Sequence, residues 1–266
     1  MRPVHTAPKI LWLKRHEPAV FERAHKLLGI HEYLLWLLSG EFATDASIAS
    51  RSCLMDIASL RWSKELLERM GIPEEKLCEL RLPGSICGRV SERAARLCGL
   101  PAGLPVCTAG GDQQCAALGM GVAAPGDMLL NVGTGIYALS ALERPEHAAQ
   151  RDGVACVAAA RTGGWLLEAS CGASARLYQQ CRDTYFGGDD SYAGINAAAW
   201  KAEAALCAQG PCGWLNEPRA GIAYLTLRHI ADEAAACVRR LEKTADAPLP
   251  VSGGLTRQPL FLRLLA

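Results

Sequence analysis

The residues best suited to chemistry in this sequence are an aspartate and two glutamines that follow paired glycines, in the run GGDQQ at 110–114. Asp112 lies between an apolar segment typical of a short strand and a run of small residues typical of a helix. An aspartate there can cap the helix by accepting backbone N–H hydrogen bonds. The cap explains Asp112 but not the glycines, which let a ligand approach the backbone closely. Since ligands bind at strand ends in α/β proteins, Asp112 is a candidate catalytic or ligand-binding residue as well as an N-cap.

Two further glycine-rich turns are candidate anion-binding sites. In the turn Gly133-Thr134-Gly135, backbone N–H groups and the threonine hydroxyl can hold phosphate oxygens. A plain hairpin turn is the alternative, because glycine supplies the positive φ that tight turns need. The pair Gly253-Gly254 can place a nucleotide at a helix N-terminus, or can simply link a strand to a helix. The segment around Gly253-Gly254 matches neither a Walker loop nor the G-x-G-x-x-G pattern.

The elements that must position these residues follow from hydrophobic periodicity and turn residues. The first hundred residues are predicted to be mostly helical, and strands enter from residue 104. A strand followed by two glycines and a helix occurs twice, at 104–121 and at 248–266. Strands mixed with helices indicate an α/β sheet core. The predicted helices are 7–29, 31–40, 46–56, 63–73, 90–103, 112–121, 172–186, 191–205, 230–244 and 255–266, and the predicted hairpins are 127–142 and 153–170.

Composition limits the classes of function. The chain has 266 residues, of which 50% are hydrophobic and 21% charged, and its net charge of +1 does not favour nucleic acid or an anionic membrane as a partner. No apolar stretch reaches the length of about 18 residues that a membrane span requires. The twelve cysteines include no C-x-x-C pair, which favours free thiols and a reducing, cytoplasmic compartment. The scattered histidines have no metal-ligand spacing, so no metal site is predicted.

Five segments of the chain carry a resemblance to a known family: TAPKILWLKRHEP, GEFATDASIASRSCLMDIASLRW, GGDQQCAALGMGVAAPGDMLLNVGTG, WLLEASCGASARLYQQ and LPVSGGLTRQPLF. Together these segments resemble the FGGY family of carbohydrate kinases, of the xylulokinase and glycerol kinase type. The resemblance implies an α/β protein with the actin/hexokinase-like ATPase (ribonuclease H-like) fold and an incomplete first domain. Residues 1–103 would be a mostly helical remnant of the N-terminal domain. Residues 104–266 would be the ATPase core, spanning the end of that domain and part of the C-terminal kinase domain.

The resemblance also implies roles for individual residues. Asp112 matches the general base that takes the proton from a substrate hydroxyl, and Gln113 matches a residue that hydrogen-bonds the substrate. Gly133, Thr134 and Gly135 match the turn that holds the terminal phosphates of the nucleotide. Gly253 and Gly254 match the loop near the α-phosphate and adenosine. The implied cofactors are ATP and Mg²⁺, and the implied partner is a sugar or polyol.

Departures from the family pattern leave two functions open. The Asp-x-Gly-Thr phosphate loop of the family is missing, the Pro-x-x-x-Gly-Glu-Arg-like segment is passed over, and the chain stops within a helix, so truncation at both ends is expected. The chain is therefore either an ATP-dependent carbohydrate kinase or an inactive truncated relative that at most binds nucleotide or sugar. GDQQ and GTG are closer to glycerol kinase, whereas TAPKILWLK and AAPGDMLLNVGTG are closer to xylulokinase. The substrate and the oligomeric state, for which a homodimer is one alternative, stay open.

Overall fold

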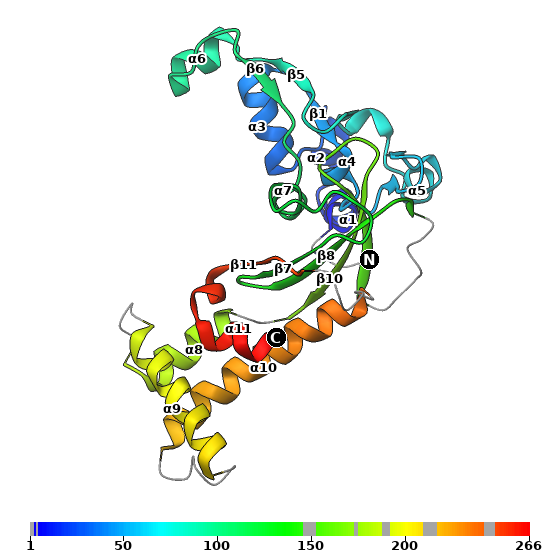
Figure 1. Cartoon of the computed structure of the whole chain (residues 1–266). Coiled ribbons are helices and arrows are strands. Elements are labelled where there is room, and N and C mark those ends of the chain that lie inside the picture. Colours follow the sequence, from blue (N-terminus) through cyan, green and yellow to red (C-terminus); the bar gives the residue numbers. More distant parts are fainter. Residues whose placement is uncertain are drawn as a thin grey trace. The chain divides into compact units, whose positions relative to one another are not determined.

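The computed structural model describes residues 3, 5–145, 153–172, 175–187, 192–209, 217–241 and 248–266. The chain divides into two compact units. The first unit comprises Met1–Pro125, Ala141–Ala149 and Cys156–Leu166, and the second comprises Gly126–Ser140, Gln150–Ala155 and Leu167–Ala266. Figure 1 labels their elements. Within the described ranges, no helix has both the length and the apolar character that crossing a membrane requires.

Glycines that the sequence predicted as helix stops end several helices of the first unit. The predicted helix over 7–29 is divided at Pro18, which occupies the first turn of the second piece. Gly40, Gly71 and Gly99 end three of the helices with φ values of 83°, 59° and 75°, a region that glycine reaches without strain. The helices are α1 Thr6–His16, α2 Pro18–Arg23, α3 Ile30–Ser39, α4 Ala46–Ala49, α5 Lys64–Met70, α6 Glu92–Cys98 and α7 Asp112–Gly119, with a short 3₁₀ turn, η1 Glu74–Lys76.

Of the short strands in the first unit, only β6 was predicted from the sequence. β1 Ala43–Asp45 pairs in parallel with β4 Glu79–Arg81. β2 Met55–Asp56 pairs with β3 Arg61–Trp62, and β5 Ile86–Arg89 pairs with β6 Pro105–Cys107, both antiparallel. The helix predicted over 46–56 is wrong beyond Ala49, because the chain turns at Cys53 with φ 62° and then enters β2. Strands of two to four residues are too short to show a period-two pattern.

One five-stranded sheet contains the predicted hairpins and has the strand order β11-β7-β8-β10-β9. β7 Met128–Val132 pairs antiparallel with β8 Ile136–Leu142 and parallel with β11 Val251–Ser252. β9 Val154–Ala158 and β10 Trp165–Cys171 form the second hairpin, in which Ala159 N donates to Gly164 O. Met128, Leu129 and Leu130 of β7 are at most 4% exposed, so this strand lies in the core. β8, β9 and β10 each have residues in both units.

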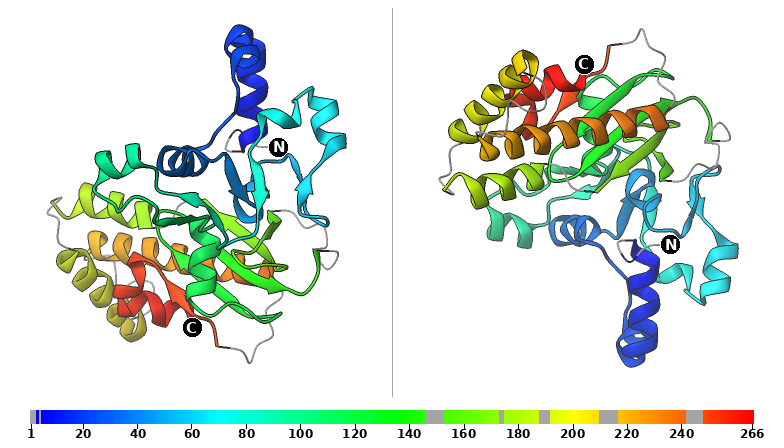
Figure 2. Two further views of the ribbon diagram at one scale, coloured as in Figure 1. Left: turned by 90° about the horizontal axis from the view of Figure 1, so that it is seen from above. Right: turned by 90° about the horizontal axis from the view of Figure 1, so that it is seen from below.

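Helices of the second unit pack around α10 Pro218–Arg240, which contacts α8 Ala175–Tyr185, α9 Ala193–Gln209 and α11 Pro259–Leu265. Figure 2 shows α10, in orange, crossing one face of the green strands. α10 begins twelve residues before the prediction of 230–244, because Pro218 starts a helix at its first turn. The helix predicted over 255–266 begins with a 3₁₀ turn, η4 Gly254–Arg257. The predicted helix positions 173–174, 191 and 242–244 lie outside the described residues.

A cap on α6 gives a direct test of this local structure. Ser91 Oγ accepts a hydrogen bond from Ala94 N at 3.1 Å. Ser91→Ala is expected to lower the free energy of unfolding by about 1 kcal/mol, because it leaves that helix N–H group without its acceptor. Urea denaturation measures the change. Ser91→Asp keeps an oxygen acceptor and should retain wild-type stability, so an equal loss in both variants would contradict the cap.

Candidate functional site

Asp112 lies in the first unit and is the first residue of α7, whereas the sequence predicted it to be the N-cap. Gly111 is the N-cap, with φ −69° and ψ 149°, and Asp112 is the first helical residue. The predicted role of Asp112 as N-cap is therefore wrong, because its backbone has already turned into the helix. Asp112 Oδ1 accepts a hydrogen bond from Gln113 N at 2.8 Å. The carboxylate is exposed at the positive end of the helix, and Gln113 beside it is half-buried.

Packing within the first unit constrains the two glycines before Asp112, Gly110 more strictly than Gly111. Gly110 has φ +94°, and a Cβ atom there would lie 2.9 Å from Ser47 Oγ and 3.1 Å from Ala160 Cβ. A Cβ atom on Gly111 would lie 2.3 Å from Oε1 of the buried Gln114. The Cβ side of each glycine thus faces other parts of the first unit.

The turn before α7 is also held by the helix itself. Cys115 Sγ donates to Ala109 O at 2.6 Å, and Cys115 N donates to Gly111 O at 2.8 Å. Burial raises the pKa of the Cys115 thiol, and the negative charges of Asp45 and Asp112 raise it further. Cys115 therefore stays a neutral thiol that can donate this hydrogen bond.

The second unit contains the predicted phosphate-binding turn between β7 and β8. Gly133 N donates to Gly135 O at 3.0 Å, and Ala175 N at the start of α8 donates to Gly133 O at 3.1 Å. Thr134 is exposed at the tip of the turn. Neither glycine has a positive φ, so the conformational explanation for a plain hairpin turn is wrong here. Instead, a Cβ atom on Gly135 would lie 2.9 Å from the ring of Tyr137.

Gly253 and Gly254 follow β11, at the same sheet edge as the Gly133 turn, because parallel β7 and β11 end on the same side. Gly253 has φ +104°, and its Cβ atom would lie 2.2 Å from Val132 O. Around Gly254 no atom lies within 4 Å of a Cβ position. The positive φ and the nearby Val132 backbone thus require glycine at position 253, whereas the Cβ side of Gly254 faces open space.

A cavity of about 260 Å³ adjoins Gly254 in the second unit. Tyr178 OH donates to Asn196 Oδ1 at 3.0 Å, and burial raises the pKa of Tyr178 to about 12. Gln258 is 4% exposed. Its side-chain amide lies near the Tyr178 hydroxyl and lowers the pKa of Tyr178, against the effect of burial. Its buried Nε2 atom nevertheless makes no hydrogen bond of normal geometry to the residues that the structure describes. The cavity is lined by Ala175, Tyr178, Tyr192, Asn196, Gly254, Leu255, Arg257 and Gln258.

Sequence reasoning did not identify Tyr178, Asn196 or Gln258 as site residues. Gln258 has a local signal, because it follows the Gly-Gly pair and precedes a helix-starting proline. Tyr192 and Asn196 have none, because they come from the start of α9 and meet η4 only in the folded chain.

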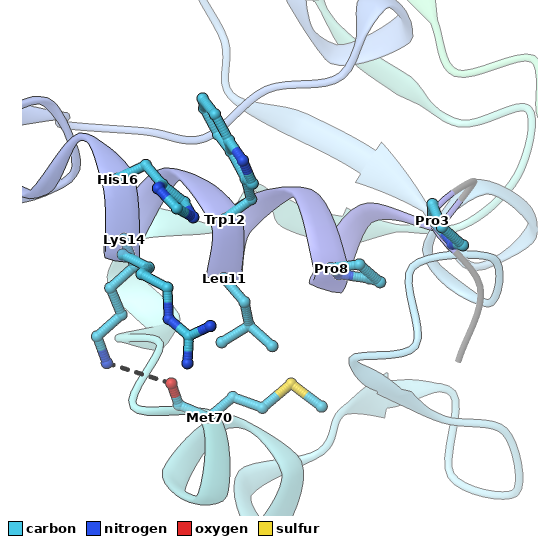
Figure 3. Close-up of a pocket in the computed structure, with 8 residues that line it drawn as sticks. Pro3, Pro8, Leu11, Trp12, Lys14, His16 and Met70 are labelled. Atoms are coloured by element: carbon cyan, nitrogen blue, oxygen red, sulfur yellow. Dashed lines mark hydrogen bonds between the residues drawn. The ribbon is translucent and has the colours of Figure 1, made fainter.

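A hollow of about 720 Å³ along α1 in the first unit contains none of the predicted site residues. Figure 3 shows Leu11 and Met70 on its walls, with Trp12 and Lys14 on the same helix as Leu11. Lys14 Nζ donates to Met70 O at 3.2 Å. Because Lys14 also donates to Gly71 O at 2.6 Å, it serves to fasten α1 to the end of α5.

The predicted residues thus fall into two groups. Asp112 and Gln113 belong to the first unit. Gly133, Thr134, Gly135, Gly253 and Gly254 belong to the second unit, where they share one sheet edge. Among the residues placed by the structure, no group of three or more His, Cys, Asp and Glu side chains is arranged to hold a metal ion.

Several solved structures share the fold of this chain. The chain superposes on gluconate kinase from Lactobacillus acidophilus with a TM-score of 0.84 at 19% identity, covering 100% of this chain and 58% of that one. For xylulose kinase from Rhodospirillum rubrum the TM-score is 0.79 at 24% identity, covering 98% and 57%. For Plasmodium falciparum glycerol kinase, solved with ADP, it is 0.80 at 22% identity, covering 97% and 57%. The chain therefore has the mixed α/β, actin-like ATPase fold that its sequence predicted.

Part of the sequence matches a known family. Residues 1–119 match the model of the FGGY family of carbohydrate kinases, N-terminal domain. Autoinducer-2 kinases from Salmonella typhimurium and Escherichia coli are 36% and 38% identical to the chain over 127 residues. The match covers 48% of this chain and 24% of those kinases, so the matched region is about a quarter of their length. Residues 1–119 are thus similar to the N-terminal domain of the FGGY carbohydrate kinases, as the motifs in that part of the chain indicated.

Proposed function

We propose that this chain serves in the ATP-dependent phosphorylation of a sugar or polyol hydroxyl, with Asp112 as the general base. The observation that carries the proposal is the exposed carboxylate of Asp112, which follows a fixed glycine turn at the start of α7 within the segment that matches the family. In such a reaction the carboxylate takes the hydroxyl proton while the substrate oxygen attacks the γ-phosphorus. Asp112 is accessible to a hydroxyl, as this role requires.

The second unit supplies features suited to the nucleotide. The Gly133-Thr134-Gly135 turn would hold the terminal phosphates, because its exposed threonine and its backbone lie at the sheet edge where ligands bind. The open backbone at Gly254 would face the α-phosphate. The adjacent cavity would take the base, and Gln258 Nε2 is a buried donor that suits an acceptor nitrogen on it. Mg²⁺ would accompany the nucleotide, since phosphates supply the oxygen ligands it prefers.

The substrate class follows from the family and from Gln113, whose half-buried amide beside Asp112 suits a hydroxyl-rich ligand. Gluconate, xylulose, glycerol and autoinducer-2 are the substrates to test, because they appear in the names of the similar kinases. The twelve cysteines without disulfide spacing support a cytoplasmic setting.

The proposal is tested by measuring binding and turnover on the same preparation. ATP binding is followed by calorimetry, and phosphorylation of the four substrates by release of ADP in the presence of Mg²⁺. Turnover of any of them supports the kinase. ATP binding without turnover supports the alternative, an inactive relative that binds nucleotide. Absence of both would exclude a nucleotide site in this chain.

A substitution in the cavity that adjoins Gly254 tests whether the nucleotide base binds there. Gln258→Glu keeps the Oε1 acceptor that caps Leu260 N but replaces the Nε2 donor. We expect at least about 10-fold weaker ATP binding, since a buried donor–acceptor pair contributes about 1.5 kcal/mol. Gln179→Glu places the same charge on an exposed position of α8 and is the control. Equal ATP affinities for the two variants would place the nucleotide base away from Gln258.

A further inference from the structure

The buried carboxylate of Asp45 makes more hydrogen bonds than its helix requires. Asp45 is 0% exposed and caps α4, accepting from Ser47 N at 2.9 Å and from Ile48 N at 3.4 Å. It also accepts from two hydroxyl groups, Ser47 Oγ at 2.5 Å and Thr108 Oγ1. Only the backbone bonds belong to a helix cap. The Ser47 hydroxyl belongs to α4 itself, whereas the Thr108 hydroxyl connects Asp45 to the segment after β6.

Ser47 links Asp45 to the turn before Asp112. A serine hydroxyl has one proton, and Ser47 donates it to Asp45 Oδ1. Its oxygen is then left as an acceptor, and Gly111 N donates to it at 3.0 Å. Ser47 is 0% exposed, so water does not compete for this bond. Because a hydrogen bond to a carboxylate is about twice as strong as a neutral one, Asp45 fixes the direction in which Ser47 accepts.

Thr108 connects Asp45 to the other end of the same turn. Thr108 follows β6 directly and is 0% exposed. Asp45 thus holds residue 108 directly and residue 111 through Ser47. Between these two points lies Gly110, whose φ of +94° and filled Cβ side leave it little freedom. The turn is fixed at both ends by one carboxylate that is 63 residues away from Thr108 in sequence.

We infer that Asp45 and Ser47 are positioning residues, which fix the Gly110-Gly111 turn and thereby the direction of the Asp112 carboxylate. This inference rests on the proposed function, in which Asp112 is the base. A misplaced base loses rate steeply, because proton transfer requires hydrogen-bond reach of the substrate hydroxyl. Substrate and nucleotide contacts are not part of the connection, so its loss should lower kcat and leave the KM for ATP nearly unchanged.

The test compares two serines on α4. Ser47→Ala removes the acceptor of Gly111 N. Ser50→Ala removes the acceptor of Ala158 N, at 3.1 Å, and the donor to Ser47 O, at 3.0 Å, but no hydrogen bond to residues 108–111. Amide hydrogen exchange followed by NMR should show Gly111 N–H exchanging at least about 10-fold faster in Ser47→Ala. In Ser50→Ala the Gly111 rate should stay within twofold of wild type. Unchanged exchange in Ser47→Ala, or equal acceleration in both variants, would overturn the inference.

Turnover separates positioning from the proposed function. Ser47→Ala should lower kcat about 10-fold with the KM for ATP within twofold, and Ser50→Ala should keep kcat within twofold. Faster Gly111 exchange with unchanged kcat would refute the positioning role. If the wild-type chain shows no turnover, the proposed function fails for this chain, while the exchange data still decide whether Ser47 fixes the turn.

A second pair of variants covers the case in which Ser47→Ala does not fold. Thr108→Val keeps the shape of the side chain but removes its hydroxyl, and Thr108→Ser keeps the hydroxyl that Asp45 accepts. We expect faster Gly111 exchange and a lower kcat in Thr108→Val and wild-type values for both in Thr108→Ser. Equal values for the two variants would show that the hydroxyl has no positioning role.

Discussion

Replacing Asp112 with asparagine is expected to lower the rate of phosphoryl transfer at least about 100-fold, the lower end of what a general base contributes. Asparagine has the shape of aspartate, and its Oδ1 can still accept from Gln113 N, so α7 should begin as before. The substitution removes the negative charge and with it the ability to take a proton. The measurement is kcat by ADP release, together with ATP affinity by calorimetry, which should stay within twofold.

A control for this substitution exists on another helix of the first unit. Glu92 is an exposed acid in the first turn of α6, and Glu92→Gln removes a charge from a similar helix position. Its kcat should stay within twofold of wild type. If Asp112→Asn retained turnover, Asp112 would not be the base. If ATP affinity collapsed along with turnover, the residue would be structural instead.

Replacing Gly253 with alanine is expected to lower the free energy of unfolding by about 3 kcal/mol or more. Its φ of 104° and ψ of 170° lie in a region that costs other residues about 1–3 kcal/mol. The added Cβ would also lie 2.2 Å from the backbone oxygen of Val132, which cannot move aside without disturbing β7. Guanidinium denaturation followed by circular dichroism measures the loss.

The neighbouring glycine is the matched control. Gly254 has no positive φ and no atom within 4 Å of its Cβ position, so Gly254→Ala should stay within about 0.5 kcal/mol of wild-type stability. Because Gly254 lines the cavity, the same variant should weaken ATP binding if the nucleotide lies there. Equal destabilisation by both variants would show that the backbone at Gly253 is not the constraint. Wild-type ATP affinity in Gly254→Ala would place the nucleotide away from this loop.

The local pattern predicted most of the elements that carry the candidate site. The two segments in which a strand leads through paired glycines into a helix are present at β6–α7 and β11–η4. The glycines that stop α3, α5 and α6 were also readable, because helix stops depend on neighbours within one turn. The exact start of α7 was not, since both Gly111 and Asp112 are acceptable N-caps and the choice depends on what holds the turn.

The sequence by itself predicted the α/β class, the resemblance to carbohydrate kinases and the positions of Asp112 and of the glycine turns, because periodicity, caps and motifs are properties of neighbouring residues. Only the tertiary structure decided that Asp45 and Ser47 hold the turn before Asp112, since these bonds join segments more than 60 residues apart. The same holds for the cavity that α8, α9 and η4 enclose. Such contacts depend on which distant segments pack together in the folded chain, and a local sequence pattern does not contain that information.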